Sequence, residues 1–330
     1  MNIYLTYDYE LFFGKETGTA EQCILAPTNK LIEVAKRTGV QLTFFIDVGY
    51  IKQLRAHSQF NSVYQDYQRV VEQIKILVAQ GHDCQLHIHP HWEDSYHNGK
   101  EWLMNTKRYK LTDFSEADIL KIVLEYQKIL SDITQQPVNK YRAGGWCLQP
   151  FSKVKAAFEA AGLIIDSTVF LDGKNTIAPY YYNFTKCPKK DTWRFSDELC
   201  TEDLNGQFIE YPISAYKYSA LFFWRLFLLG RLKPKSHKPI GNGFPVPSVG
   251  MRKEMLTKGK CLSASCDGYF VTKLNAICNR NAQKGWGHTV VIGHPKALTR
   301  YSIAKLESFI EQQQNKGHVF TVFASDKFCS

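Results

Sequence analysis

The 330-residue sequence lacks several features that would define common classes of protein. It has no internal repeat and no low-complexity tract, which excludes a repeat architecture. Its glycines form no G-x-G-x-x-G pattern after a strand, so we expect no dinucleotide-binding site. Its nine cysteines are odd in number and lack zinc-finger spacing, which favours reduced thiols over a disulfide framework. No apolar signal segment precedes the strand-like residues Ile3–Thr6, and this also predicts a cytoplasmic protein.

Acidic residues are scarce in one region of the chain. Between Tyr216 and Lys260 there are ten basic residues and a single acid, Glu254, so this segment carries a net charge of +9, against +10 for the whole chain. The rest of the chain is therefore close to neutral, which argues against a nucleic-acid-binding protein. The localised charge predicts that one anionic partner docks at one place.

Strand-like apolar runs alternate with helical patterns along most of the chain. The predicted strands are Ile3–Thr6, Gln41–Asp47, Cys84–Ile88, Lys140–Ala143, Leu163–Ser167, Phe208–Pro212, Thr289–Gly293 and Val319–Ala324. The predicted helices are Pro27–Arg37, Ser62–Ala79, Glu116–Ile133, Ser152–Ala161, a helix near Tyr269–Ala282, and Ser302–Gln314. About seven or eight such units predict an α/β fold, a closed or nearly closed (β/α) barrel, with an open doubly wound sheet as the alternative.

The segment 214–260 interrupts this alternation, and we interpret it as an insertion in a single domain of residues 1–330. Its apolar run Leu221–Leu229 is about half as long as the ~20 residues of a membrane-spanning helix. Basic residues follow this run, a combination that suits a membrane interface. We therefore predict peripheral contact of residues 219–238 with the inner membrane face. A buried helix or a dimer contact is the alternative.

Side chains that suit a metal site follow three of the predicted strands. They are Asp8 and Glu10 after the first strand, His87 near the end of the third strand with His89 and His91 after it, and His294 after the seventh. Two histidines four residues apart, such as His87 and His91, can hold one metal ion through two imidazoles. Carboxylates, paired histidines and a late histidine at strand ends together predict a metal-assisted hydrolase.

Four motifs resemble those of the polysaccharide deacetylase family, the NodB-homology carbohydrate esterases. The most specific is the second, in which Gly81-His82-Asp83 with His87 and His91 matches Gly-His-acid-x-x-x-His-x-x-x-His in register. The others are the acid-bearing residues 6–10, the Arg-led turn of residues 141–146, and the strand-end His294. The third motif departs from the family form, since Gly144-Gly145-Trp146 replaces the usual Pro-Tyr.

The resemblance implies a distorted (β/α)7-8 barrel that hydrolyses an N-acyl amide, such as an acetamide, on a sugar or a lipid-linked glycan. It implies Asp8 as the base, Arg142 as the residue that orients it, and His294 as the acid. It also implies one divalent metal, zinc above others, on His87, His91 and Glu10. His89 is the alternative third ligand, and Trp146 and Asp166 are further candidates for the site.

Such a metal site leaves open positions for a water molecule and a carbonyl oxygen, and zinc lowers the pKa of a bound water to ~7. Two other functions stay open at this point. One is hydrolysis of a small cyclic amide on the same fold. The other is a non-catalytic member of the family that binds a glycan or a partner protein.

Overall fold

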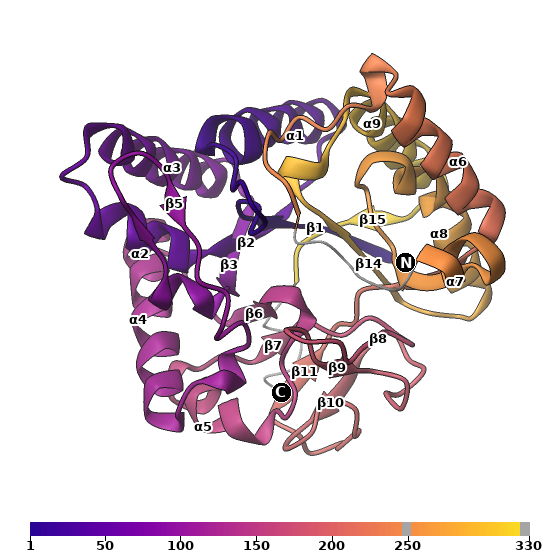
Figure 1. The fold of residues 1–330 in the computed structure, drawn as a ribbon. Helices are drawn as coiled ribbons and strands as arrows, with labels where there is room; N and C mark the ends of the chain where they lie inside the picture. The colour runs from indigo at the N-terminus through magenta and orange to yellow at the C-terminus, as the bar shows by residue number, and fades with distance from the viewer. Residues whose placement is uncertain (246–251, 324–330) are drawn as a thin grey trace. The chain divides into compact units, whose positions relative to one another are not determined.

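The structure, a computed structural model, describes residues 1–245 and 252–323, and it divides into two compact units. The first unit comprises Met1–Val40, Phe170–Gly173 and Ile213–Thr321. The second comprises Gln41–Val169 and Lys174–Pro212, with residues 322–323. Both units combine parallel strands with helices, which confirms the α/β class (Figure 1). The single-domain interpretation of the chain stays a prediction.

The first unit is built around strand β1 (Asn2–Tyr9), of which seven of eight residues are buried. Strand β14 (His288–Gly293) pairs in parallel with β1, and β15 (Val319–Phe320) pairs in parallel with its start. Helices α1 (Ala26–Thr38), α8 (Leu274–Gln283) and α9 (Arg300–Gln314) each bury one face. The register pairs Tyr7 with Gly293, so the residues that follow these two strands lie at one edge.

In the second unit the strands lie in the order β10, β11, β7, β6, β3, β2. Their bounds are Trp193–Phe195, Phe208–Glu210, Ile165–Asp166, Lys140–Ala143, Asp83–Ile88 and Thr43–Asp47, respectively. All pairs are parallel except β10 with β11. The helices of this unit are α2 (Val48–Ala56), α3 (Asn61–Ala79), α4 (Glu116–Thr134) and α5 (Ser152–Ala161). The register aligns Asp47, His87 and Arg142 across three neighbouring strands, which gathers polar side chains at their carboxyl ends.

The remaining elements are short. The two-residue strands are β4 (Tyr96–His97), β5 (Trp102–Leu103), β8 (Lys174–Asn175) and β9 (Tyr182–Asn183). A π-helix, η1, covers Glu21–Leu25, and the 3-10 helices are η2 (Pro90–Asp94), η3 (Leu111–Asp113), η4 (Gly144–Trp146), η5 (Lys235–His237), η6 (Gly268–Lys273) and η7 (Pro295–Ala297). The predicted strand Val319–Ala324 is shorter than expected, and Ala324 lies outside the described residues.

The segment 214–260 lies within the first unit. Strand β12 (Ala215–Tyr218) near its start pairs antiparallel with β13 (Lys260–Ser263) at its end. Between them lie α6 (Ala220–Leu232) and α7 (Arg252–Lys258). This antiparallel pair brings the two ends of the segment together, so the chain leaves and rejoins the rest of the first unit at neighbouring positions.

One expectation about the cysteines is wrong. Cys187 and Cys200 form a disulfide, although the sequence favoured reduced thiols throughout. Free thiols among the described residues include Cys23, Cys84, Cys147, Cys266 and Cys278. Disulfides are rare in reducing compartments, so the cytoplasmic location stays a prediction. Over the ranges 1–245 and 252–323, no helix combines the length and the apolar character needed to cross a bilayer.

Candidate active site

In the first unit Asp8, Glu10 and His294 lie together at the edge formed by β1 and β14. Nε2 of His294 lies 3.7 Å from Oδ2 of Asp8 and 3.8 Å from Oε1 of Glu10. Both carboxylates are buried, whereas His294 is partly exposed. The structure thus brings the predicted base and the predicted acid side by side, which is the arrangement that a proton relay needs.

Asp267 holds the ring of His294, and nothing in the sequence motifs indicated this residue. Nδ1 of His294 donates to Oδ2 of Asp267 at 2.7 Å, and the backbone N–H of His294 donates to Oδ1 at 2.8 Å. Burial lowers the pKa of His294, but Asp267 foremost, then Asp8 and Glu10, raise it to about 9. The ring is therefore an imidazolium at neutral pH, with one N–H fixed by Asp267 and the other directed to the carboxylates.

Lys296 is the cation that accompanies Glu10. Its Nζ donates to Oε1 of Glu10 at 2.8 Å and to the carbonyl oxygen of Leu11, and both charged side chains are buried. A carboxylate this deeply buried is stable only when its charge is compensated. Lys296 follows His294 by two residues, so one short 3-10 turn supplies both positive groups that face the acids.

In the second unit His87 and His89 lie on one face of the chain. His87 belongs to β3, and the backbone stays extended at His89 (φ −104°, ψ 94°), so side chains at alternate positions point the same way. The two ring centroids are 4.8 Å apart. Nδ1 of His87 lies 2.8 Å from the carbonyl oxygen of Arg142, to which it donates as the Nδ1–H tautomer. This contact leaves Nε2 as the lone-pair nitrogen for a metal.

His91 lies one turn further, in η2, and is packed among aromatic rings. It stacks on Tyr109 at 5.8 Å between centroids and 12° between planes, and on Trp92 at 6.0 Å and 26°. The indole N–H of Trp92 donates to Oδ2 of Asp47 at 2.7 Å. Asp47 is a buried carboxylate at the end of β2, and sequence reasoning missed it although it also ends a predicted strand.

The unusual third motif has a steric reason. A Cβ on Gly144 would lie 2.6 Å from Nδ1 of His89 and 2.7 Å from the carbonyl oxygen of Ile88, so only glycine lets His89 occupy its place. The next residue, Gly145, has a φ of +61°, and Trp146 shares this left-handed conformation. Trp146 is half-buried against Tyr182, with 5.8 Å between ring centroids.

Arg142 and Asp166 are buried within the second unit. Nε of Arg142 donates to the carbonyl oxygen of Ser167 at 2.8 Å. Asp166 accepts from the hydroxyl of Thr168 at 2.7 Å and from its backbone N–H at 3.2 Å, which are turn-type bonds. Strand register places Glu210 opposite Asp166, and burial followed by the charge of Asp166 raises the pKa of Glu210 well above its usual value. Glu210 is another residue that the motifs did not indicate.

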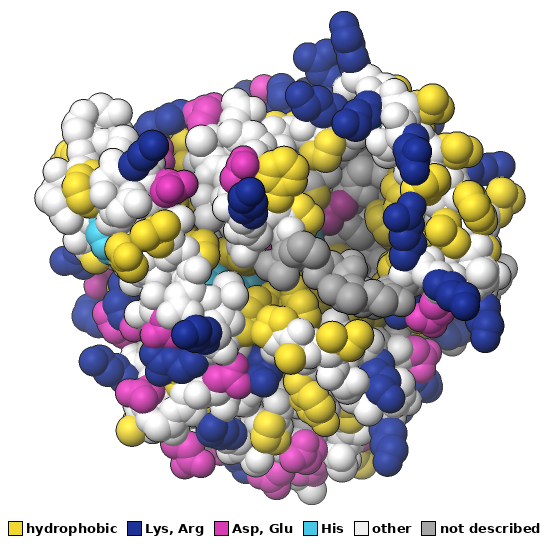
Figure 2. All heavy atoms as spheres, viewed as in Figure 1, with side chains coloured by type: hydrophobic (Ala, Val, Ile, Leu, Met, Phe, Trp, Pro, Cys, Tyr) yellow, Lys and Arg dark blue, Asp and Glu magenta, His cyan; other side chains and the backbone are white. Residues whose placement is uncertain are grey.

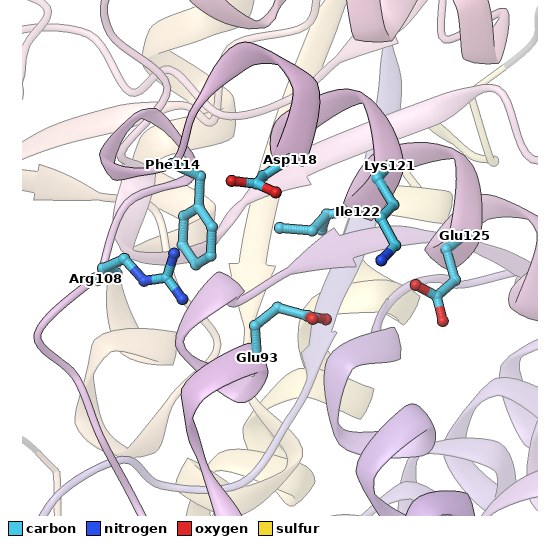
Figure 3. A pocket seen from close by; sticks show the side chains of 7 residues that line it. All are labelled: Glu93, Arg108, Phe114, Asp118, Lys121, Ile122 and Glu125. Carbon is cyan, nitrogen blue, oxygen red and sulfur yellow. The ribbon is translucent and has the colours of Figure 1, made fainter.

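The described residues of the second unit line at least two pockets. The larger, about 550 Å³, is lined by Lys107, Lys110, Tyr180 and Tyr181 among others. Tyr180 packs edge-on against Tyr109, which stacks on His91, so the ring of Tyr109 lies between this pocket and His91. The smaller, about 140 Å³, is shown in Figure 3 and has none of the predicted site residues in its lining: Glu93, Arg108, Phe114, Asp118, Lys121, Ile122 and Glu125.

In the second unit the buried imidazoles of His87 and His89 are donors that suit a divalent ion. The first unit offers the buried carboxylate of Glu10. Imidazoles and carboxylates are ligands of zinc and similar first-row ions, so the donors in each unit fit the metal that the sequence predicts. His89 stands in this set where the sequence favoured His91, and the role of His91 as a ligand stays a prediction.

The chain is similar to solved polysaccharide deacetylases over nearly its whole length. No family model matches the sequence, and no curated protein matches it. One solved structure comes from Mycobacterium smegmatis and is provisionally named a polysaccharide deacetylase. It is similar to this chain with a TM-score of 0.51 and 14% identity, over 98% of this chain and 93% of that one. This structural likeness confirms the resemblance that the motifs indicated.

Two further structures are similar. The PuuE allantoinase has a TM-score of 0.51 and 13% identity, over 98% of this chain and 88% of that one. A family 4 carbohydrate esterase from Streptomyces lividans, in complex with acetate, has a TM-score of 0.41 and 10% identity, over 98% of this chain and 93% of that one. At 13–14% identity the two structures with a TM-score of 0.51 show the fold alone, and the prediction of an α/β fold of the deacetylase type is confirmed.

Proposed function

We propose that the chain is a metal-dependent hydrolase that removes an acyl group, with acetyl as the first candidate, from the nitrogen of a sugar. The observation that carries this proposal is the pairing of Asp8 with His294, 3.7 Å apart, with His294 held by Asp267. An amine leaves only if it receives a proton, and an attacking water must lose one. A carboxylate beside an imidazolium supplies both functions.

We propose His87 and His89 as metal ligands, with His91 as the alternative to His89, and we keep Glu10 as the carboxylate ligand that the deacetylase motif implies. The ion, which we take to be zinc, would supply a Lewis acid for the acyl oxygen and lower the pKa of water. The tautomer of His87 set by the carbonyl of Arg142 supports its assignment. Lys296, whose Nζ donates to Oε1 of Glu10, would keep this carboxylate ionised, as a ligand must be.

In this proposal Asp8 and His294 each transfer one proton, and two further residues position them. Asp8 takes the proton of the attacking water, and His294 delivers its Nε2 proton to the leaving nitrogen. Asp267 is a positioning residue, because it fixes the ring through Nδ1. We keep Arg142 as the residue that orients Asp8, since its guanidinium is charged at every accessible pH.

The pocket beside Tyr109 supports a sugar substrate. Tyr180 and Tyr181 in its lining present rings of the kind that stack on sugars, and Lys107 offers positive charge beside Lys110, which is paired with Asp113. This combination suits an N-acylated sugar that carries an anionic group, such as a phosphate or a carboxylate. We retain the cytoplasm as the proposed compartment.

The test is release of acetate from N-acetylated sugars by the metal-loaded protein. Asp8→Asn should lower kcat by about 10²–10⁴-fold while the metal stays bound. The matched control is Asp132→Asn, which changes an exposed aspartate paired with Lys128 and should leave the rate unchanged. Full activity of the Asp8→Asn variant would contradict the proposed role of Asp8.

A second candidate is hydrolysis of a small cyclic amide. The allantoinase structure favours it, because its TM-score equals that of the first deacetylase structure. The same Asp8 and His294 would serve, since opening a cyclic amide also requires a base and an acid. Turnover of allantoin or a hydantoin, with no acetate from any N-acetylated sugar, would decide for this candidate.

A further inference from the structure

Helix α6 (Ala220–Leu232) carries apolar side chains on two sides. Its inner side packs into a small cluster of the first unit, where the buried Phe222 and Phe223 meet Tyr218. Tyr269 and Phe270 complete this cluster. The inner side therefore accounts for how the helix is anchored, and it leaves the outer apolar side to be explained.

The outer side is a continuous apolar stripe exposed to solvent. The exposed fractions are 61% for Leu221, 47% for Trp224, 52% for Leu228 and 77% for Leu232. Spacings of three, four and four residues place these side chains one above another on a helix. Single exposed leucines are ordinary on protein surfaces, but an aligned row that includes a tryptophan indicates contact with an apolar medium.

Basic side chains frame this stripe. On the helix, Arg225 and Arg231 fall on opposite sides of it, and Lys233, Lys235 and Lys238 follow the helix. The neighbouring α7 begins with Arg252 and Lys253. The single acid, Glu254, is paired with Lys260 at 2.9 Å. Figure 2 shows hydrophobic and positively charged side chains gathered together over α6.

We propose that this stripe and its basic frame dock onto the surface of an anionic lipid bilayer. Leucine and tryptophan side chains enter the boundary between head groups and acyl chains, and Lys and Arg meet the anionic head groups. Helix α6 has thirteen residues, a length that suits a helix lying in the interface. The indole N–H of Trp224 donates to the carbonyl of Leu256 at 3.0 Å, so its exposed ring edge enters lipid without an unsatisfied donor.

The charge favours a bilayer over a second copy of the chain. A symmetric dimer through this face would bring two segments of net charge +9 together, and like charges at an interface oppose association. An anionic surface gains from the same charge. The proposal does not depend on the proposed activity, because it concerns residues outside the catalytic cluster.

The test is co-sedimentation of the full chain with vesicles of phosphatidylcholine containing about a third phosphatidylglycerol. We expect binding that weakens with added salt, and at least tenfold weaker binding to phosphatidylcholine alone. The variant Leu221→Gln/Leu228→Gln/Leu232→Gln should lose at least tenfold in binding. Leu204→Gln is the matched control, because Leu204 is 79% exposed in the second unit, and it should bind like the wild type.

Trp224 provides a second readout that does not rest on removing leucines. Vesicles should shift the tryptophan emission of the wild type to the blue, and Trp224→Phe should abolish that shift while the protein still sediments with vesicles. Equal binding of the triple variant and the wild type, or no binding to the anionic vesicles, would overturn the proposal. So would a dimer in solution that the triple variant abolishes.

Discussion

Among single residues, Gly144 sets the place of His89. Alanine at this position would put a Cβ 2.6 Å from the imidazole, and the ring would have to move. We expect Gly144→Ala to weaken zinc binding by about 10–100-fold, the range seen when the surroundings of a ligand are disturbed. Isothermal titration with zinc measures this change.

The control for that substitution is Gly230→Ala. Gly230 lies inside α6, and a Cβ there would meet nothing within 4 Å. Alanine should therefore stabilise the helix by up to about 1 kcal/mol and leave zinc binding unchanged. Zinc binding by Gly144→Ala equal to that of the wild type would mean that His89 is not a ligand.

His82, the first histidine of the second motif, is a structural residue. Its Nδ1 accepts the backbone N–H of Leu42 at 3.3 Å, and burial lowers its pKa to about 4. Because the folded protein keeps His82 neutral, this residue contributes fully to stability above the pKa of about 6.5 that a histidine has in the unfolded chain. That contribution is lost as the pH falls towards 4. His82 can account for a decrease of at most about 3 kcal/mol in the free energy of unfolding.

His82→Asn should remove that part of the pH dependence. The difference in the free energy of unfolding between the wild type and the variant should shrink as the pH falls from 7 to 4.5. Over that range His82 becomes protonated in the unfolded wild type but stays neutral in the folded one, and the variant has no such group. Urea denaturation at the two pH values measures it. A difference that stays constant with pH would show that His82 titrates normally in the folded protein.

The strand-end positions of most site residues could be predicted from the sequence, because each one follows an apolar run. The motif favoured His87 and His91, four residues apart, as the ligand pair, whereas the extended backbone at His89 places His87 and His89 on one face. Asp267 could not be predicted, since it meets His294 through a segment with no regular pattern. Glu210 is paired by strand register alone.

Between elements, the pairing of β7 with β11 brings two acids together. Glu210 faces Asp166 in the interior, and burial with the neighbouring charge raises its pKa well above the usual value. A carboxyl whose folded pKa is raised stays protonated in the fold, and it lowers stability increasingly as the pH rises above the unfolded pKa of about 4.3.

Glu210→Gln should therefore stabilise the protein at pH 8. Glutamine keeps an oxygen that accepts from the backbone N–H of Val169, which lies 3.0 Å from Oε1 of Glu210, and it does not ionise in the unfolded chain. The gain in the free energy of unfolding should fall towards zero near pH 4. A variant that is less stable than the wild type at pH 8 would mean that Glu210 is ionised in the fold.

The helices α1, α3, α4, α5, α8 and α9 matched their sequence patterns, because a helical period becomes visible over several turns. Helix α2 and the four-residue strands β12 and β13 were not predicted. The two-residue strands β4, β5, β8 and β9 were not predicted, since two residues show no alternation. The disulfide between Cys187 and Cys200 was missed for a related reason, because sequence spacing does not specify which cysteines meet in space.

For the whole molecule, the fold class followed from the alternation of strands and helices. The motifs indicated the deacetylase family although the similar structure from Mycobacterium smegmatis shares only 14% of its residues. A small set of strand-end residues indicates that resemblance, whereas the overall sequence identity is too low to indicate it. The way three chain segments form the first unit could not be predicted, because it depends on contacts between residues far apart in sequence.

The central claim is that His87 and His89 hold a divalent ion, and the metal content of the purified protein tests it most directly. Elemental mass spectrometry of the wild type should find about one zinc or similar ion per chain. His87→Ala and His89→Ala should lose it, and His318→Ala, a change outside the site, should keep it. Retention in His89→Ala with loss in His91→Ala would return the ligand role to His91. A wild type that holds no metal and takes up none from micromolar zinc would contradict the account.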